Sequence, residues 1–346
     1  MPNNDFPVFG STNNSLLKKH LTKEIYYSLN DLKTSSGFTL DQAIKSGVVN
    51  DGSNVGIYAG DLESYKIFAP IFDKIIADYH NFSTSDSHTS DLTPPESGWA
   101  NPDPEGKYII STRIRVGRNL ADMPLGTAIS KEQRDEIESK VSAILKGLTG
   151  ELAGDYYPLA GMSEEDSTRL IEDHFLFKAG DKYLEAAGLN RDWPSGRGIF
   201  HNHDKTFLVL INEEDQLRII SMQNGGDIFQ VFSRLSKAVA ILSDAFSFLY
   251  NDHLGFITSC PTNLGTAMRA SVHIKLPNLA KNMEIFEKIT DEYFLQIRGI
   301  HGEHSESEEG IFDISNKRRL GISEVDLLQG LYDGVLALIN MDKEAV

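Results

Sequence analysis

The sequence predicts an α+β protein in which a small all-helical N-terminal domain precedes a larger domain with an antiparallel sheet flanked by helices. Three observations support this. Apolar residues at helical spacing fill the first part of the 346-residue chain, a polar and proline-rich stretch follows, and alternating strands with grouped helices make up the rest. The expected boundaries are 1–84 for the helical domain, 85–107 for a linker and 108–346 for the larger domain.

The helical unit is predicted from periodicity. Leu17, Leu21, Ile25 and Leu29 recur at every fourth position, which indicates one face of a single helix. Similar patterns predict helices over 39–47 and 62–79, with a turn-rich loop at 51–58 between them.

The stretch 81–106 is first rich in Ser, Thr and Asp and then contains four prolines. This composition predicts an interdomain linker. A long surface loop within one domain is the alternative.

In the larger domain, hairpin-connected strands are expected at 108–116, 206–211, 217–222, 268–276 and 294–300. Residues 212–215 are predicted to form the hairpin turn between the second and third of them. Ser130 and Gln133 fit a capping box that opens a helix over 130–147. Further helices are expected near 165–174, 227–250, 279–291 and 323–341.

Composition narrows the function. The net charge of −17 argues against DNA or RNA as a partner. No apolar run is long enough to cross a membrane, and the polar N-terminus does not resemble a secretory signal. Cys260 is the single cysteine, so internal disulfides are impossible, and we expect a cytoplasmic protein.

Arginines recur in this acidic chain at positions that would form a local positive pocket if they converged, as suits a nucleotide polyphosphate. They are Arg113, Arg115, Arg118, Arg218, Arg269 and Arg298. Strand alternation places Arg113 and Arg115 on one face, with Ile114 on the other. Paired guanidinium groups suit phosphate oxygens, although surface salt bridges are the alternative.

The strand 268–276 alternates in the same way. Arg269, Ser271, His273 and Lys275 share one face, and apolar residues share the other. The polar face lines a cleft or is simply solvated.

Three acidic or reactive segments indicate which substrate binds beside the nucleotide. Residues 299–310 form a glycine-bracketed acidic stretch, which predicts a lid or a disordered loop. The carboxylates of 213–215 suit a planar cation such as a guanidinium, although a solvated hairpin tip is the alternative. Converging arginines are expected to lower the pKa of the Cys260 thiol. A cation beside a polyphosphate pocket implies phosphoryl transfer to nitrogen.

Several motifs carry a resemblance to the phosphagen (ATP:guanidino) kinases, and within them to the arginine kinases. They are the segments 260–266, 111–115, 212–215, 269–273, 298–299 and 313–321. The resemblance extends from about residue 15 to the C-terminus, and it implies the two-domain fold described above.

The resemblance also implies an ATP site. The corresponding residues are Ser111, Arg113, Arg115, His174, Arg218, Arg269, Ser271, Val272, His273, Arg298, Gly299 and Asp313. Magnesium in this family is held by the ATP phosphates and water without direct protein ligands, and Glu213 and Asp215 match positions that organise this water.

The acceptor site follows from the same resemblance. Glu214 and Glu303 match the carboxylates that clamp the guanidinium, and Cys260 matches the thiolate that contacts it. The remaining acceptor-binding residues are Ser53, Asn54, Val55 and Tyr58 in a short loop. Tyr79 stands where arginine kinases carry Tyr, so the resemblance implies L-arginine and MgATP as substrates.

Three positions depart from the pattern of many arginine kinases: Asn54 replaces Gly, His301 replaces Arg and Leu210 replaces Trp. The alternatives are therefore a kinase for another guanidino compound such as taurocyamine, a bacterial-type protein-arginine kinase, or a non-enzymatic relative. The helical unit argues against the second, and the retained motif residues argue against the third. A monomer is expected, with a dimer as the alternative.

Overall fold

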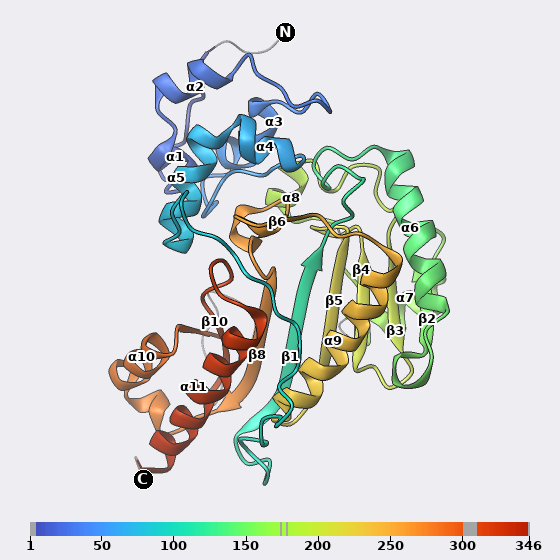
Figure 1. Cartoon of the computed structure of the whole chain (residues 1–346), viewed down its shortest axis with the longest axis vertical. Helices are drawn as coiled ribbons and strands as arrows, with labels where there is room; N and C mark the ends of the chain where they lie inside the picture. The colour runs from blue at the N-terminus through green and yellow to red at the C-terminus, as the bar shows by residue number, and fades with distance from the viewer. Residues whose placement is uncertain (1–4, 174, 178, 300–309, 345–346) are drawn as a thin grey trace.

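The computed structural model describes residues 5–173, 175–177, 179–299 and 310–344. The chain has a helical unit at one end and a large antiparallel sheet covered by helices, as predicted (Figure 1). The boundaries proposed between the domains stay a prediction.

The helical unit consists of α1 (Leu16–His20), α2 (Lys23–Leu29), α3 (Leu40–Val49), α4 (Leu62–Ile67) and α5 (Ala69–His80). The single helix expected over 17–29 is wrong, because Thr22 takes an extended conformation and its side chain caps α2 by accepting from the Ile25 N–H at 3.2 Å. The helix expected over 62–79 is likewise interrupted at Phe68. The apolar face survives both breaks, since Leu17 and Leu29 are buried on either side of the first and Tyr65 and Phe72 on either side of the second.

The large sheet has the strand order β2-β3-β4-β5-β1-β8-β10-β9, and its paired neighbours are antiparallel. Its strands are β1 (Ile109–Arg118), β2 (Gly154–Pro158), β3 (Gly198–Asn202), β4 (Phe207–Ile211), β5 (Leu217–Asn224), β8 (Met268–Lys275), β9 (Leu295–Arg298) and β10 (Ile311–Asn316). A separate two-stranded sheet pairs β6 (Tyr250–Asn251) with β7 (Gly255–Phe256). The sequence predicted neither β2, β3 nor β10.

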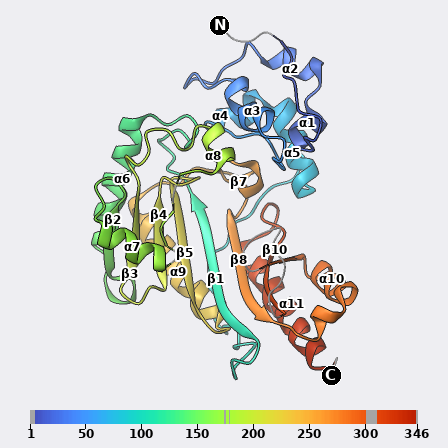
Figure 2. The same ribbon diagram turned by 180° about the vertical axis from the view of Figure 1, so that it is seen from behind.

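Strand alternation gives the large sheet two different faces. On one face Ile114, Val209 and Ile219 join the main core, and α9 and α11 pack over it (Figure 1). On the opposite face Leu208, Leu210 and Ile220 form a smaller cluster, with the strands in view in Figure 2. The second face is therefore the one that can receive a ligand.

The helices of the large domain are α6 (Lys131–Lys146), α7 (Glu164–Glu172), α8 (Lys182–Ala186), α9 (Ile228–Ala245), α10 (Met283–Glu292) and α11 (Glu324–Glu344). The capping box at Ser130 and Gln133 is confirmed. The sequence did not predict α8, which packs against α3 of the helical unit. In the part of the chain that the structure describes, no helix combines the length and apolar character needed to cross a lipid bilayer.

The segment 81–107, here called the strap, crosses the helical face of the large domain (Figure 1). The Ser236 hydroxyl on α9 donates to the Leu92 carbonyl at 2.7 Å, and the Trp99 indole donates to Gln329 of α11 at 2.8 Å. The strap is thus fixed to the large domain at two separate points.

Arg118 lies beneath the strap, on the face of β1 opposite to Arg113. Its guanidinium is 3.6 Å from Glu324, lies 3.4 Å from the ring centroid of Phe256, and donates to the Thr266 carbonyl at 3.0 Å. The expectation that Arg118 joins the other arginines is therefore wrong, because an odd-numbered spacing along a strand reverses the face.

The strap residue His88 should make the fold sensitive to acid. The Gly321 N–H donates to His88 Nδ1 at 3.2 Å, so this nitrogen carries no proton. Burial, and then the charge of Arg118, lower the pKa of His88 to about 4. The unfolded chain therefore binds this proton first, and stability falls as pH drops from about 6.5 toward 4.

Replacing His88 by Asn should keep an acceptor but remove this titration. We expect the loss of unfolding free energy between pH 7 and pH 5 to shrink by up to about 2 kcal/mol. Urea unfolding of both proteins at the two pH values measures it, and equal losses would contradict the assignment.

Candidate active site

Polar side chains on the ligand-facing side of the sheet are aligned by strand register. Ser111, His273, Asp313 and Arg298 lie opposite one another across β1, β8, β10 and β9. Two residues further along β1, Arg113 lies opposite Ser271, and two beyond that Arg115 lies opposite Arg269. Directly opposed residues of antiparallel strands share a face, so the register gathers segments that are far apart in sequence.

Arg113 and Arg115 are largely buried cations. Neither forms a hydrogen bond or ion pair with a residue in the described ranges, which is costly for buried charge. Burial first, and then the repulsion of neighbouring arginines including Arg218, lower the pKa of Arg113 to about 10 and lower that of Arg115 well below its usual value. Such a pair is prepared for a polyanion that supplies the missing counter-charge.

Asp313 organises the far side of this cationic face. Arg269 Nη2 lies 2.7 Å from one carboxylate oxygen, and His273 Nε2 lies 3.3 Å from the other. Burial alone would raise the pKa of Asp313, but His273 and Arg269 lower it on balance. Asp313 therefore stays ionised and fixes the orientation of both side chains.

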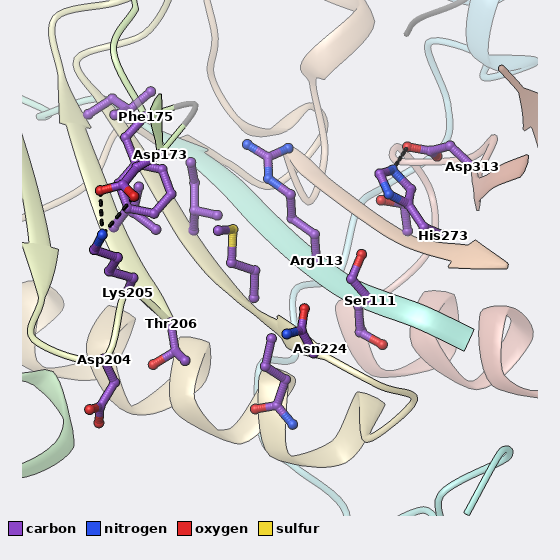
Figure 3. Close-up of a pocket in the computed structure, with 17 residues that line it drawn as sticks. Ser111, Arg113, Asp173, Phe175, Asp204, Lys205, Thr206, Asn224, His273 and Asp313 are labelled. Atoms are coloured by element: carbon purple, nitrogen blue, oxygen red, sulfur yellow. Dashed lines mark hydrogen bonds and ion pairs between the residues drawn. The ribbon is translucent and has the colours of Figure 1, made fainter. Parts of the chain in front are cut away.

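A cavity of about 630 Å³ lies along this face (Figure 3). Its polar end carries Ser111, Arg113 and His273, while its middle is lined by Leu208, Ile220 and other apolar side chains. This volume suits a small organic ligand. An apolar slot that leads to cations fits a nucleotide, with the base in the slot and the phosphates at the arginines.

The end of the cavity away from Arg113 is lined by an ion pair that sequence reasoning missed. Lys205 and Asp173 lie 2.6 Å apart, and Phe175 is buried beside them (Figure 3). No motif signalled these residues, because Lys205 belongs to the turn between β3 and β4, and β3 itself was not predicted.

The predicted hairpin turn at 212–215 joins β4 to β5. Asn212 has φ 56°, and its side-chain amide donates to the carbonyls of Arg134 and Gly196 at 3.0 and 2.6 Å. Glu213 pairs with Arg218 at 2.7 Å, which lies 3.6 Å from Glu214. The anchored turn thus places carboxylates at the cationic end of the sheet.

Glu214 has an unusual charge state. Burial first, and then Asp215, raise its pKa to about 7, while Arg218 acts in the opposite direction. The Asp215 carboxylate is partly engaged, since one oxygen accepts from the Asn119 amide at 2.9 Å and from the Ser259 N–H at 3.0 Å. Glu214 can therefore accept a proton near neutral pH.

Carboxylates and cations meet at one point. A cavity of about 30 Å³ is lined by Arg115, Arg218, Arg269, Glu214 and Asp215. Asn263 and Arg319, which the sequence analysis did not assign, also line it. Both residues lie within motifs that carry the family resemblance, 260–266 and 313–321, but the sequence analysis assigned neither of them a role.

Cys260 lies close to this point and is buried. The expected lowering of its pKa is wrong for this arrangement: burial, and then the negative field of Glu214, raise the pKa of the thiol to about 12, although contacts with Thr262 oppose the shift. The arginines do not offset the effects of burial and of Glu214. Cys260 therefore carries its proton here at neutral pH.

The predicted acceptor loop belongs to the helical unit and contacts Cys260 through Tyr58. Tyr58 packs with Cys260, Ala187 and Leu189, and the burial of its phenol raises its pKa, helped by the negative field of Glu214. Ser53 and Val55 are buried, and Asn54 is exposed. The Asn54 carbonyl accepts from the Leu16 N–H at 2.9 Å, and the Val55 carbonyl accepts from the Leu17 N–H at 2.9 Å, which fixes the loop on α1.

The remaining predicted residues have different outcomes. Val272 faces the main core, so its side chain does not line the cavity. Arg298 and Gly299 line a different hollow beside α10, although Arg298 is in register with Asp313. Tyr79 is exposed and lies edge-on to His80. His174, His301 and Glu303 lie outside the described residues, as does most of the predicted lid.

Comparison with known proteins agrees with this geometry. The family model for the ATP:guanido phosphotransferase N-terminal domain matches residues 11–77, and the model for the C-terminal catalytic domain matches residues 136–345. The chain is 55% identical over 331 residues to the arginine kinase Lit v 2 of Penaeus vannamei, covering 95% of this chain and 93% of that protein. It is 54% identical to an arginine kinase of Anthopleura japonica, covering 96% of this chain and 47% of that protein.

Solved structures show the same fold. The substrate-free duplicated taurocyamine kinase of Schistosoma mansoni superposes with a TM-score of 0.91 at 45% identity, covering 96% of this chain and 47% of that one. A lombricine kinase superposes with a TM-score of 0.91 at 39% identity, covering 98% and 94% of the two chains. The matched models, the relatives and the shared fold together establish that this chain belongs to the ATP:guanido phosphotransferase family.

Proposed function

We propose that the chain catalyses the reversible transfer of the γ-phosphoryl group of MgATP to a guanidino nitrogen of L-arginine, giving phosphoarginine and ADP. The observation that carries this proposal is the small cavity at which Glu214 meets Arg115, Arg218 and Arg269. A guanidinium held by the carboxylate would there face a phosphoryl group held by the arginines.

In this mechanism the protein aligns the reactants and balances their charge. The cations at 113, 115, 218 and 269 neutralise the phosphoryl oxygens, and Ser111, Ser271 and His273 border the nucleotide. Val272, Arg298, Gly299, His174 and Asp313 keep the nucleotide roles that the family resemblance implies. Asp313 acts by holding Arg269 and His273 in place.

Glu214 holds the acceptor nitrogen and takes its proton as the N–P bond forms and the bond to the ADP oxygen breaks. Glu303 is proposed as the second carboxylate of this clamp. Cys260 serves as an electrostatic partner of the guanidinium: the substrate cation would favour the thiolate and so offset the burial that now raises the thiol pKa. Ser53, Asn54, Val55 and Tyr58 receive the amino-acid end.

Magnesium enters with ATP as part of the substrate, where it neutralises charge on the phosphates. Glu213 and Asp215 are proposed to hold its water molecules. Oxygen donors of this type suit Mg²⁺. The described residues contain no group of three His, Cys, Asp or Glu side chains with metal-ligand spacing.

L-Arginine is preferred over other guanidino compounds for two reasons. The curated relatives at 53–55% identity are arginine kinases, and Tyr58 is buried at the acceptor site. Taurocyamine remains the second candidate, because a taurocyamine kinase shares the fold with a TM-score of 0.91. Cytoplasmic location and a monomeric state are also proposed, and size-exclusion chromatography with light scattering tests the latter.

A coupled assay of MgATP consumption with a panel of acceptors tests this proposal. We expect kcat/KM for L-arginine to exceed that for taurocyamine, lombricine and creatine by at least about tenfold, since a misfitting acceptor loses alignment. A higher value for taurocyamine would replace arginine as the substrate, and no acceptor-dependent consumption would contradict the reaction itself.

A further inference from the structure

The turn that carries Cys260 is held from the helical unit by three hydrogen bonds. The Tyr65 hydroxyl donates to the Thr258 carbonyl at 2.9 Å, and the Ala59 N–H donates to the Ser259 carbonyl at 2.8 Å. His80 Nε2 lies 2.8 Å from the Pro261 carbonyl. Donors from α4, from α5 and from the residue after Tyr58 thus hold the carbonyls on both sides of the cysteine.

The large domain holds the same turn from the opposite side. Asp215 accepts from the Ser259 N–H at 3.0 Å, and Arg319 Nη1 donates to the Thr262 carbonyl at 2.8 Å. The Cys260 carbonyl accepts from the Thr258 hydroxyl at 2.8 Å. The backbone around the thiol is therefore fixed between the two units.

Burial makes these bonds difficult to replace with water. Tyr65, Thr258 and Ser259 are at most 5% exposed. A buried carbonyl that loses its donor keeps the cost of desolvation, so the turn would move to recover a partner.

His80 has a defined protonation state at this contact. A carbonyl oxygen only accepts, so Nε2 must carry the proton. Burial lowers the pKa of His80 to about 4, although the bond to Pro261 opposes the shift, and the ring is neutral at pH 7. One neutral donor therefore fixes the residue that directly follows the cysteine.

We infer that the helical unit positions the reactive thiol as well as receiving the acceptor, and that His80 is a positioning residue for phosphoryl transfer. Ala59, which follows the acceptor loop, is hydrogen-bonded to Ser259, the residue before Cys260. The positions of the acceptor and of the thiol are therefore fixed relative to each other. This inference rests on the proposed function. Loss of the His80 bond should displace the thiol from the guanidinium but leave the nucleotide cavity intact.

The experiment compares His80→Phe, which fills the space but cannot donate, with His80→Gln, which can. His253→Phe is the matched control, because His253 Nδ1 makes an equivalent contact with the Asp86 carbonyl of the strap at 2.6 Å. The readouts are kcat, KM for ATP and the rate of alkylation by iodoacetamide, which reports on Cys260 alone because the chain has one cysteine.

For His80→Phe we expect kcat to fall about tenfold, KM for ATP to stay within about twofold, and alkylation to speed up, because a released turn exposes the thiol. His80→Gln should recover most of both properties, and His253→Phe should match the parent protein. Tyr65→Phe, which removes only the donor to Thr258, should shift alkylation in the same direction and keeps the test available if His80→Phe folds poorly.

The inference would be overturned if kcat and the alkylation rate were unchanged in both His80→Phe and Tyr65→Phe. It would also be overturned if these variants lowered the melting temperature without changing kcat or the alkylation rate. Failure of the proposed function would give a different result. The parent protein would then lack acceptor-dependent turnover, but the alkylation rate would still show whether His80 and Tyr65 keep the Cys260 turn in place.

Discussion

Replacing Glu214 by Gln should lower kcat by roughly 10²–10⁴-fold, the usual contribution of a positioned proton acceptor. Gln keeps the size of the side chain and can still contact a guanidinium, but it has no negative charge and cannot take the proton. KM for ATP should change little, since the nucleotide cavity does not include this residue. Steady-state kinetics with saturating L-arginine measure the effect.

The same variant should alter the pH profile. With a pKa of about 7, Glu214 is protonated in acid, so kcat/KM of the parent protein should fall as pH drops below about 7. Glu214→Gln should lose this acidic limb. Glu138, a carboxylate bonded to the Tyr156 hydroxyl at 2.6 Å on the far side of the sheet, supplies the control: Glu138→Gln should keep both rate and profile. A parent-like kcat in Glu214→Gln would remove this residue from catalysis.

Replacing Arg115 by Met should nearly abolish activity and yet stabilise the protein without nucleotide. Arg115 is partly buried with no ion pair to any described residue and is repelled by Arg218 and Arg113, so an apolar side chain of similar length removes this repulsion. The lost cation should cost about 10²–10³-fold in kcat, as for other groups that stabilise developing charge.

Thermal unfolding with and without ADP tests both parts. The melting temperature of Arg115→Met should exceed that of the parent protein in buffer but rise less when ADP is added. Arg118→Met is the contrasting control on the other face of β1, where the pairing with Glu324 should make the substitution destabilising. A destabilised Arg115→Met that still gains the full stabilisation from ADP would contradict the role of Arg115.

Part of the cationic site could be predicted from the sequence. Alternation alone placed Arg113 and Arg115 on one face, and the same rule, applied to Arg118, should have excluded it. The strand register that aligns Ser111, His273 and Asp313 could not be predicted. The strand β10 was not predicted, and the local sequence of a strand does not determine which other strand it pairs with.

The missed elements have physical explanations. All five residues of β3 are buried, so no polar alternation marked it as a strand. The Cys260 thiol was expected to have a lowered pKa because arginines were expected to converge around it, but the pKa depends on the surrounding charges and on burial, and both require coordinates. The helix breaks at Thr22 and Phe68 were hidden because the apolar spacing continues across them.

The central claim is that the cationic face and the Glu214 carboxylate meet so that a phosphoryl group passes to a guanidino nitrogen. Phosphorus NMR of purified protein with MgATP and L-arginine tests it most directly. The account predicts a new acid-labile P–N resonance that grows in step with ADP and is lost in Glu214→Gln. Release of inorganic phosphate in its place, or a spectrum that L-arginine does not change, would contradict it.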